Sequence, residues 1–101
     1  MTAQLGLLAL LEAKPDKAGE LAAFLASGGE LAAAEPRTIT WYAFKIDETT
    51  YGIFDTFATE EARQAHLNGP IAAALMAKAG ELLAEPPKIE PVDLLAVKLA
   101  K

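Results

Sequence analysis

Residues 38–67, TITWYAFKIDETTYGIFDTFATEEARQAHL, carry the pattern that decides the fold. The stretch 37–47 is rich in β-branched and aromatic residues, which predicts a strand. The polar residues 48–50 predict a turn, and the apolar run 51–57 predicts a second strand that closes a hairpin with the first. Thr59 is placed to cap a helix that follows at once.

The flanking sequence supplies the remaining elements. Residues 4–14 form a short continuous apolar run, which is typical of a strand buried on both faces, and residues 15–27 have helical spacing of apolar positions. A second apolar stripe at helical spacing runs through 62–83, and 89–100 predict a last strand. The order β-α-β-β-α-β predicts an α+β, ferredoxin-like fold, with a four-stranded antiparallel sheet carrying two helices on one face. We expect one domain over residues 1–101.

Composition excludes several classes of function. The chain has no cysteine and one histidine, so we expect no disulfide, no thiol nucleophile and no metal site. A formal net charge of −5 argues against binding to nucleic acid or to an anionic membrane. The apolar run 5–11 is too short to cross a bilayer, and we expect a soluble, cytoplasmic protein.

Apolar side chains occupy both faces of the predicted hairpin. Because alternate residues of a strand point to opposite faces, Tyr42 and Phe44 lie on one face and Trp41 on the other. Two helices cover only one face of a four-stranded sheet, and large exposed apolar patches usually mark an interface. We therefore expect a homodimer that joins the two sheets face to face through Trp41 and Phe54. The alternative is a monomer with one partly apolar face.

Two stretches, 34–47 and 51–70, resemble the antibiotic-biosynthesis monooxygenase family of dimeric α+β barrel proteins. The matching features are Glu35 and Pro36 before the second strand, Asp55 and Phe57 near the end of the third, and ARQAH at 62–66. The resemblance implies a ligand pocket between the sheet and the helices of each subunit. It also implies, as in some members, oxygenation of electron-rich aromatic polyketides or quinols without metal or flavin. The haem-degrading branch has a histidine in the second half of this helix, where residues 71–78 have none.

His66 is the leading candidate for chemistry. It lies on the apolar stripe of the second helix, and if Asp55 faces the helices as the family suggests, the two side chains approach each other. With the hairpin closed through Ile46 and Tyr51, Tyr42 lies opposite Asp55 and completes a Tyr-Asp-His cluster. We expect His66 to act as the base, Asp55 as its orienting partner and Tyr42 as a hydrogen-bond donor to a phenolic substrate. The residues expected to bind substrate are Phe44, Tyr51, Ile53, Phe57 and Asn68.

Two functional interpretations stay open from the sequence. One is a cofactor-independent monooxygenase acting on a small aromatic. The other is a non-catalytic dimeric module of the same fold that binds a small apolar ligand, in which the cluster is only a polar network holding the helix to the sheet. This second reading is favoured by Phe57 and Ile53, which stand where active members have tryptophan and asparagine. Pro70 cannot donate a hydrogen bond to the carbonyl of His66, so the helix should bend or break beside the site.

Overall fold

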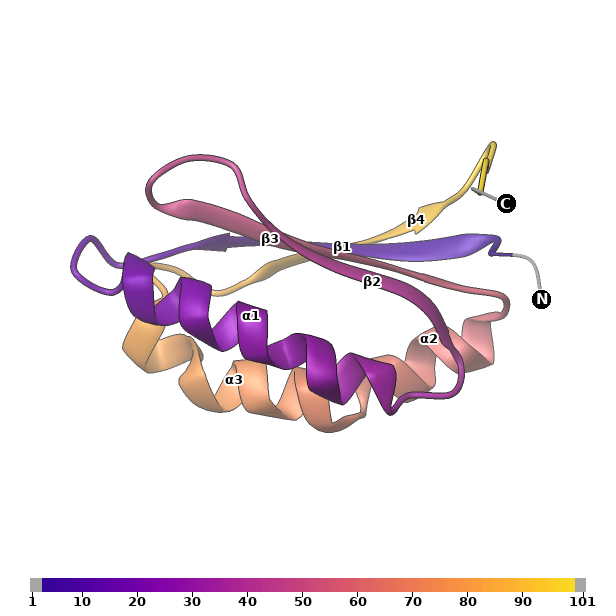
Figure 1. The fold of residues 1–101 in the computed structure, drawn as a ribbon, viewed down its shortest axis with the longest axis horizontal. Helices are drawn as coiled ribbons and strands as arrows, with labels where there is room; N and C mark the ends of the chain where they lie inside the picture. Colours follow the sequence, from indigo (N-terminus) through magenta and orange to yellow (C-terminus); the bar gives the residue numbers. More distant parts are fainter. Residues whose placement is uncertain (1–2, 100–101) are drawn as a thin grey trace.

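The computed structural model describes residues 3–99, which fold into one antiparallel sheet with all helices on one of its faces (Figure 1). The sheet order is β2-β3-β1-β4. The elements are β1 (Leu5–Glu12), α1 (Ala18–Ala33), β2 (Thr38–Lys45), β3 (Thr50–Phe57), α2 (Glu60–Leu67), α3 (Pro70–Leu82) and β4 (Lys88–Asp93). The α+β, ferredoxin-like fold predicted from the sequence is confirmed. No helix within residues 3–99 combines the length and the apolar character needed to cross a bilayer.

The second helix of the predicted order is two helices, as the proline indicated. Asn68 ends α2, Gly69 has an extended backbone, and Pro70 is the first residue of α3. Proline suits a first helical position because its missing N–H has no partner there in any helix. The break places the junction of the two helices within four residues of His66.

From Thr40 to Lys45 the pairing of β2 with β3 differs by one residue from the expected register, and these β2 side chains change face with it. The ladder is irregular between Thr38 and Thr40, and Thr38 pairs with Phe57. Lys45 pairs with Tyr51 and Trp41 with Asp55, whereas the sequence analysis paired Ile46 with Tyr51 and Tyr42 with Asp55. The turn explains the difference, since the Asp47 carboxylate accepts the backbone N–H groups of Thr49 and Thr50 at 3.0 and 2.9 Å. With a side-chain-capped turn of this kind, each β2 residue from Thr40 to Lys45 that pairs with β3 does so one position earlier in the sequence of β3 than expected.

The expected positions of Trp41 and Tyr42 are therefore wrong. Trp41 packs toward the helices, where a Cβ added to Gly28 of α1 would lie 3.1 Å from its ring. Tyr42 lies on the opposite, helix-free face of the sheet and is 54% exposed. We call this the open face. Phe54, expected there, does lie on it, over Gly6 of β1.

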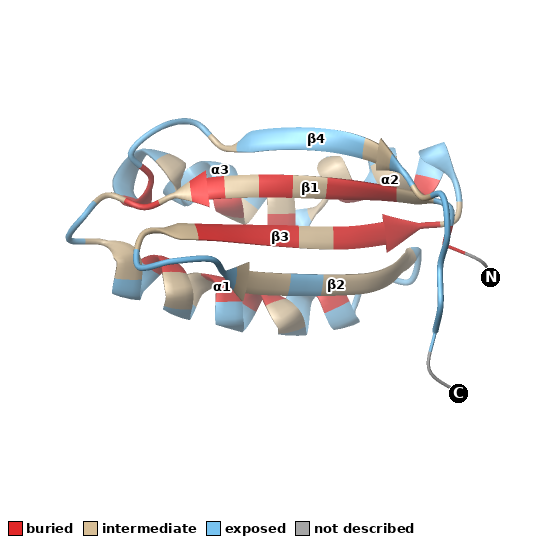
Figure 2. Ribbon diagram, turned by 90° about the horizontal axis from the view of Figure 1, so that it is seen from above, coloured by how far each residue is buried: buried red, intermediate tan, exposed pale blue. Residues whose placement is uncertain are grey.

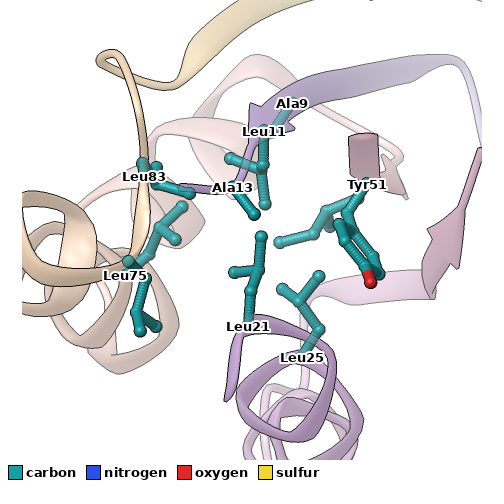
Figure 3. Packing of buried hydrophobic residues seen from close by; sticks show 10 residues of the cluster. Ala9, Leu11, Ala13, Leu21, Leu25, Tyr51, Leu75 and Leu83 are labelled. Carbon is teal, nitrogen blue, oxygen red and sulfur yellow. The ribbon is translucent and has the colours of Figure 1, made fainter. Parts of the chain in front are cut away.

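The main core fills the space between the helices and the sheet (Figure 3). Leu11 of β1 and Leu21 of α1 are almost fully buried, and Leu75 of α3 packs with them. The two central strands are the most buried part of the sheet, whereas β4 is an exposed edge (Figure 2). Removing these side chains from water drives the helices onto the sheet.

The last strand is shorter than predicted. It ends at Asp93, and residues 94–99 have no regular structure; position 100 lies outside the described residues. The ladder stops because Asp93 pairs with Leu5, the first residue of β1, and β1 offers no further partner. Leu95 is 99% exposed as a result.

Candidate functional site

His66 lies buried between two carboxylates. Its Nε2 is 2.8 Å from Oδ2 of Asp55 on β3, and its Nδ1 is 2.7 Å from Oε1 of Glu35, which precedes β2. Asp55 is 1% exposed and His66 8% exposed, so the imidazole and one carboxylate are almost completely removed from water. The contact predicted between Asp55 and His66 is present, and Glu35 extends it to a carboxylate–imidazole–carboxylate chain.

Glu35 is the site residue that the sequence analysis missed. It was noted only as part of a Glu-Pro pair, and its position between a helix and a strand is typical of a solvent-exposed loop. Thr38 orients it by donating its hydroxyl to Glu35 Oε1 at 2.8 Å. Only the three-dimensional approach of residues 31 positions apart brings it to His66.

Both ring nitrogens of His66 face carboxylate oxygens, so a protonated imidazole donates a hydrogen bond on each side. Burial by itself lowers the pKa of His66. The hydrogen bonds and negative charges of Asp55 and Glu35 together outweigh burial, and the pKa is raised above its ordinary value of 6.5. The two carboxylates thus favour the charged imidazolium over the neutral ring, and the ring of Phe57 packs against it with centroids 5.3 Å apart.

A raised pKa ties the stability of the fold to pH. The stabilisation from the His66 ion pairs is fully present below pH 6.5, the unfolded value, and is lost as the pH rises through the higher folded value. Because His66 is the one histidine of the chain, its ring signals in an NMR titration report this pKa without assignment. We expect a midpoint above 6.5 and a matching decline in the free energy of unfolding by urea above it. A midpoint at or below 6.5 would contradict the double ion pair.

Within residues 3–99, three buried side-chain atoms around this cluster lack a hydrogen-bond partner: Oε2 of Glu35, Oδ1 of Asp55 and Nε1 of Trp41. Trp41 and Asp55 are neighbours across β2 and β3 and share the helix-facing side of the sheet. Buried polar atoms without partners are rare and costly in folded proteins. Unsatisfied acceptors beside a charged imidazole are therefore candidates for contact with a bound molecule.

The other residues predicted for the site divide into two groups. Ile53 faces His66 across a small cavity, and Phe57 lies against its ring. Tyr51 is buried in the main core away from His66, and Phe44 lies on the open face over Gly52, as the corrected register requires. Asn68 is also misplaced by the sequence analysis: it is exposed and caps α2 by donating to the carbonyl of Gln64 at 3.0 Å.

Two spaces meet at His66. The first, here called the entrance groove, has a volume of about 160 Å³ and is lined by Glu35, Thr38, Ala62, Ala65, His66 and Gly69, among others. The second, here called the inner cavity, has a volume of about 40 Å³ and lies between β1, β3 and α3. Among residues 3–99 no group of three or more His, Cys, Asp and Glu side chains is arranged to hold a metal ion.

Solved structures of similar shape were found, although no protein-family model and no curated protein matches the sequence. A protein of unknown function from Nitrosomonas europaea, NE2512, is 56% identical over 98% of this chain and 96% of its own, with a TM-score of 0.95. A protein from Caulobacter crescentus described as a "putative antibiotic biosynthesis monooxygenase" is 24% identical over 93% of this chain and 92% of its own, with a TM-score of 0.79. A Nitrosomonas europaea protein with the same description is 16% identical over 94% of each chain, with a TM-score of 0.81.

Proposed function

The chain belongs to the same family as the NE2512 protein of Nitrosomonas europaea and has the fold of proteins described as "putative antibiotic biosynthesis monooxygenase". From this premise we propose that it is a cofactor-independent oxygenase of small phenols. The observation that carries the proposal is the buried Glu35–His66–Asp55 chain at the wall of a groove. A buried, charged and strongly coupled group in a concave site is a common sign of acid–base chemistry.

The roles within the cluster follow from its geometry. Both nitrogens of His66 are engaged, so the first acceptor for a phenolic proton is the unpartnered Oε2 of Glu35. Glu35 and Gly69 both line the entrance groove, and this buried oxygen would lie 3.4 Å from a Cβ at Gly69. The imidazolium of His66, held by Asp55, then stabilises the negative charge left on the phenolate. Tyr42 has no part in this proposal, since it lies on the open face.

The overall reaction balances with dioxygen as the oxidant. The phenolate is electron-rich at the carbon para to its oxygen. One oxygen atom of dioxygen forms a C–O bond with that carbon, and the O–O bond breaks. The C–H bond at that carbon breaks, a para-quinone forms, and the second oxygen atom leaves as water with the two protons from the hydroxyl and the C–H. The substrate supplies all four electrons. The protein contributes deprotonation, charge stabilisation and a site shielded from water.

The size of the groove limits the substrate. An apolar cavity of about 150 Å³ in another protein holds one benzene molecule. The entrance groove, at about 160 Å³, therefore accommodates one aromatic ring as it stands. We infer that single-ring phenols bind without rearrangement, whereas a fused polyketide requires the groove to widen.

The mutation Glu35→Gln tests this function. It keeps the shape of the side chain but removes the proton acceptor, and we expect a fall in kcat of roughly 100-fold to 10,000-fold. Oxygen uptake with a panel of single-ring and two-ring phenols, with the quinone followed by absorbance, measures it. Glu30→Gln is the matched control, since Glu30 is exposed on α1 and should leave the rate unchanged. Equal rates for the two variants, or no uptake by the wild type with any phenol, would contradict the proposal.

The engaged state of both His66 nitrogens also supports the second candidate, a non-catalytic module that binds a small apolar ligand. In that case the carboxylate–imidazole chain only joins α2 to the sheet. Calorimetry with the same phenols separates the two candidates. Binding at the groove without oxygen uptake favours the module, and binding with quinone formation favours the oxygenase.

We also propose that the protein is a homodimer through the open face. The chain exposes 6152 Å², whereas a compact monomer of 10.7 kDa exposes about 5,500 Å² by the usual scaling with mass. The excess includes the open face, where apolar side chains of three strands stand without helices to cover them; these are Leu8, Leu10, Tyr42, Phe44 and Phe54. A second copy presents the same side chains and matches them by two-fold symmetry.

A further inference from the structure

We propose that the inner cavity is a binding site for dioxygen, placed beside the Asp55–His66 pair. The inference rests on the proposed oxygenase function, because only that function requires the gas. The physical basis of the inference is independent of that function: it is the size, the wall and the position of the cavity.

The size suits a diatomic molecule. The inner cavity has a volume of about 40 Å³, and on the same measure about 10–15 Å³ is enough for one water molecule, so the cavity has room for a molecule of a few atoms. The benzene-holding cavity of about 150 Å³ is several times larger, so no aromatic ring fits here. The phenol and the gas consequently have different places, one in the entrance groove and the other in the inner cavity.

The wall favours an apolar occupant over water. Eight of its side chains are aliphatic and come from both central strands, from α2, from α3 and from β4; among them are Leu7, Ile53, Leu67, Ile71, Leu75 and Ile89. An ordered buried water typically needs two to four polar partners. Asp55 and His66 are the polar residues of this wall, and Oδ2 of Asp55 and both nitrogens of His66 are already engaged. Oδ1 of Asp55 is the one free atom that they offer, so a water here is under-coordinated.

The position suits the reaction. His66 lines both the entrance groove and the inner cavity, so the gas lies within contact of the residue that also borders the phenol. Negative charge that develops on oxygen as it takes electrons from the phenolate is stabilised by the adjacent imidazolium. The cavity thus holds dioxygen close to the electron donor, against a wall that is mostly aliphatic.

Xenon is the probe, because it binds dry apolar cavities without needing any chemistry. Crystals of the wild type under xenon pressure are expected to show one xenon atom in the inner cavity. Ala72→Leu fills the cavity from α3 and should abolish that peak, whereas Ala73→Leu, one residue along on the exposed side of the same helix, should keep it. Xenon absent from the cavity in the wild type, or still present in Ala72→Leu, would overturn the proposal.

Two further measurements separate this inference from the function on which it rests. Dissolved dioxygen is paramagnetic, and in the unmodified protein it should broaden the methyl NMR signals of Ile53 and Leu75 more than those of Leu21, which does not line the cavity. Equal broadening would overturn the site even if Ala72→Leu fails to fold. For an active enzyme, Ala72→Leu should raise KM for dioxygen and leave KM for the phenol unchanged. Xenon binding without any oxygen uptake would reject the oxygenase and leave an apolar gas site.

Discussion

Replacing His66 by alanine is expected to lower the free energy of unfolding by about 3–5 kcal/mol, the usual effect of removing one partner from a buried ion pair. The change leaves Asp55 and Glu35 without the cation between them, in a place where the aspartate is 1% exposed. Two carboxylates that lose their common partner repel each other and can no longer be compensated by water. Urea unfolding at pH 6, where the imidazolium predominates, measures the loss.

A double-mutant cycle shows whether this loss belongs to the ion pairs. In the background Glu35→Gln with Asp55→Asn, no carboxylate charge remains to be stranded, so His66→Ala should cost much less than in the wild type. Gln64→Ala is the matched control on α2, since Gln64 is exposed and its only described side-chain bond is to Glu60 at 2.8 Å. An equal loss in both backgrounds would mean that His66 stabilises the fold by packing against Phe57 and not by charge.

The sequence predicts the elements well because each one has its own local signal. The β-branched and aromatic runs predict β2 and β3, and the capping threonine predicts the start of α2, where Thr59 accepts the N–H of Ala62 at 3.1 Å. The proline predicts the break before α3. These signals act within a few residues, so no tertiary contact is needed to read them.

The register of β2 could not be read in this way. Its side chains are apolar or aromatic on both parities, and a shift of one residue exchanges two similar surfaces. Trp41 and Tyr42 were therefore assigned to each other's faces. The register is set by the turn at Asp47, whose carboxylate accepts backbone N–H groups that approach it only in the folded hairpin.

The candidate site was half predictable for a related reason. Asp55 and His66 belong to adjacent elements joined by a short connection, and the stripe of α2 turns His66 toward β3. Glu35 follows a different helix, and its side chain reaches His66 only after α1 and α2 pack on the same face. Local patterns place residues on faces, but they do not show which loops converge.

The corrected register of β2 still leaves large aromatic side chains on the open face, so a dimer through that face is still expected. Trp41 moves to the helix side, while Tyr42 and Phe44 take its place on the open face beside Phe54. Phe54 lies on β3, one of the two central strands, and is therefore near the middle of that face. Large aromatic residues at the centre of an interface usually supply most of its binding energy.

Phe54→Lys is accordingly expected to convert the dimer to a monomer. The lysine is solvated in the free subunit but becomes a buried, unpaired charge when two sheets meet, and a symmetric interface brings two of them together. Stranding a buried charge costs about 3–5 kcal/mol, which corresponds to a loss of affinity of at least about 100-fold. Sedimentation at micromolar concentration should give about twice the chain mass of 10.7 kDa for the wild type and the single mass for Phe54→Lys.

Met76→Lys provides the matched control, because Met76 is 59% exposed on α3, on the far side of the molecule from the open face. It adds the same charge and should remain dimeric. Circular dichroism distinguishes dissociation from unfolding, since the lysine at position 54 faces solvent in the monomer and should leave the fold intact. A monomeric wild type would reject the interface outright. A dimer that survives Phe54→Lys but not Met76→Lys would move the interface to the helices, with the open face left uncovered.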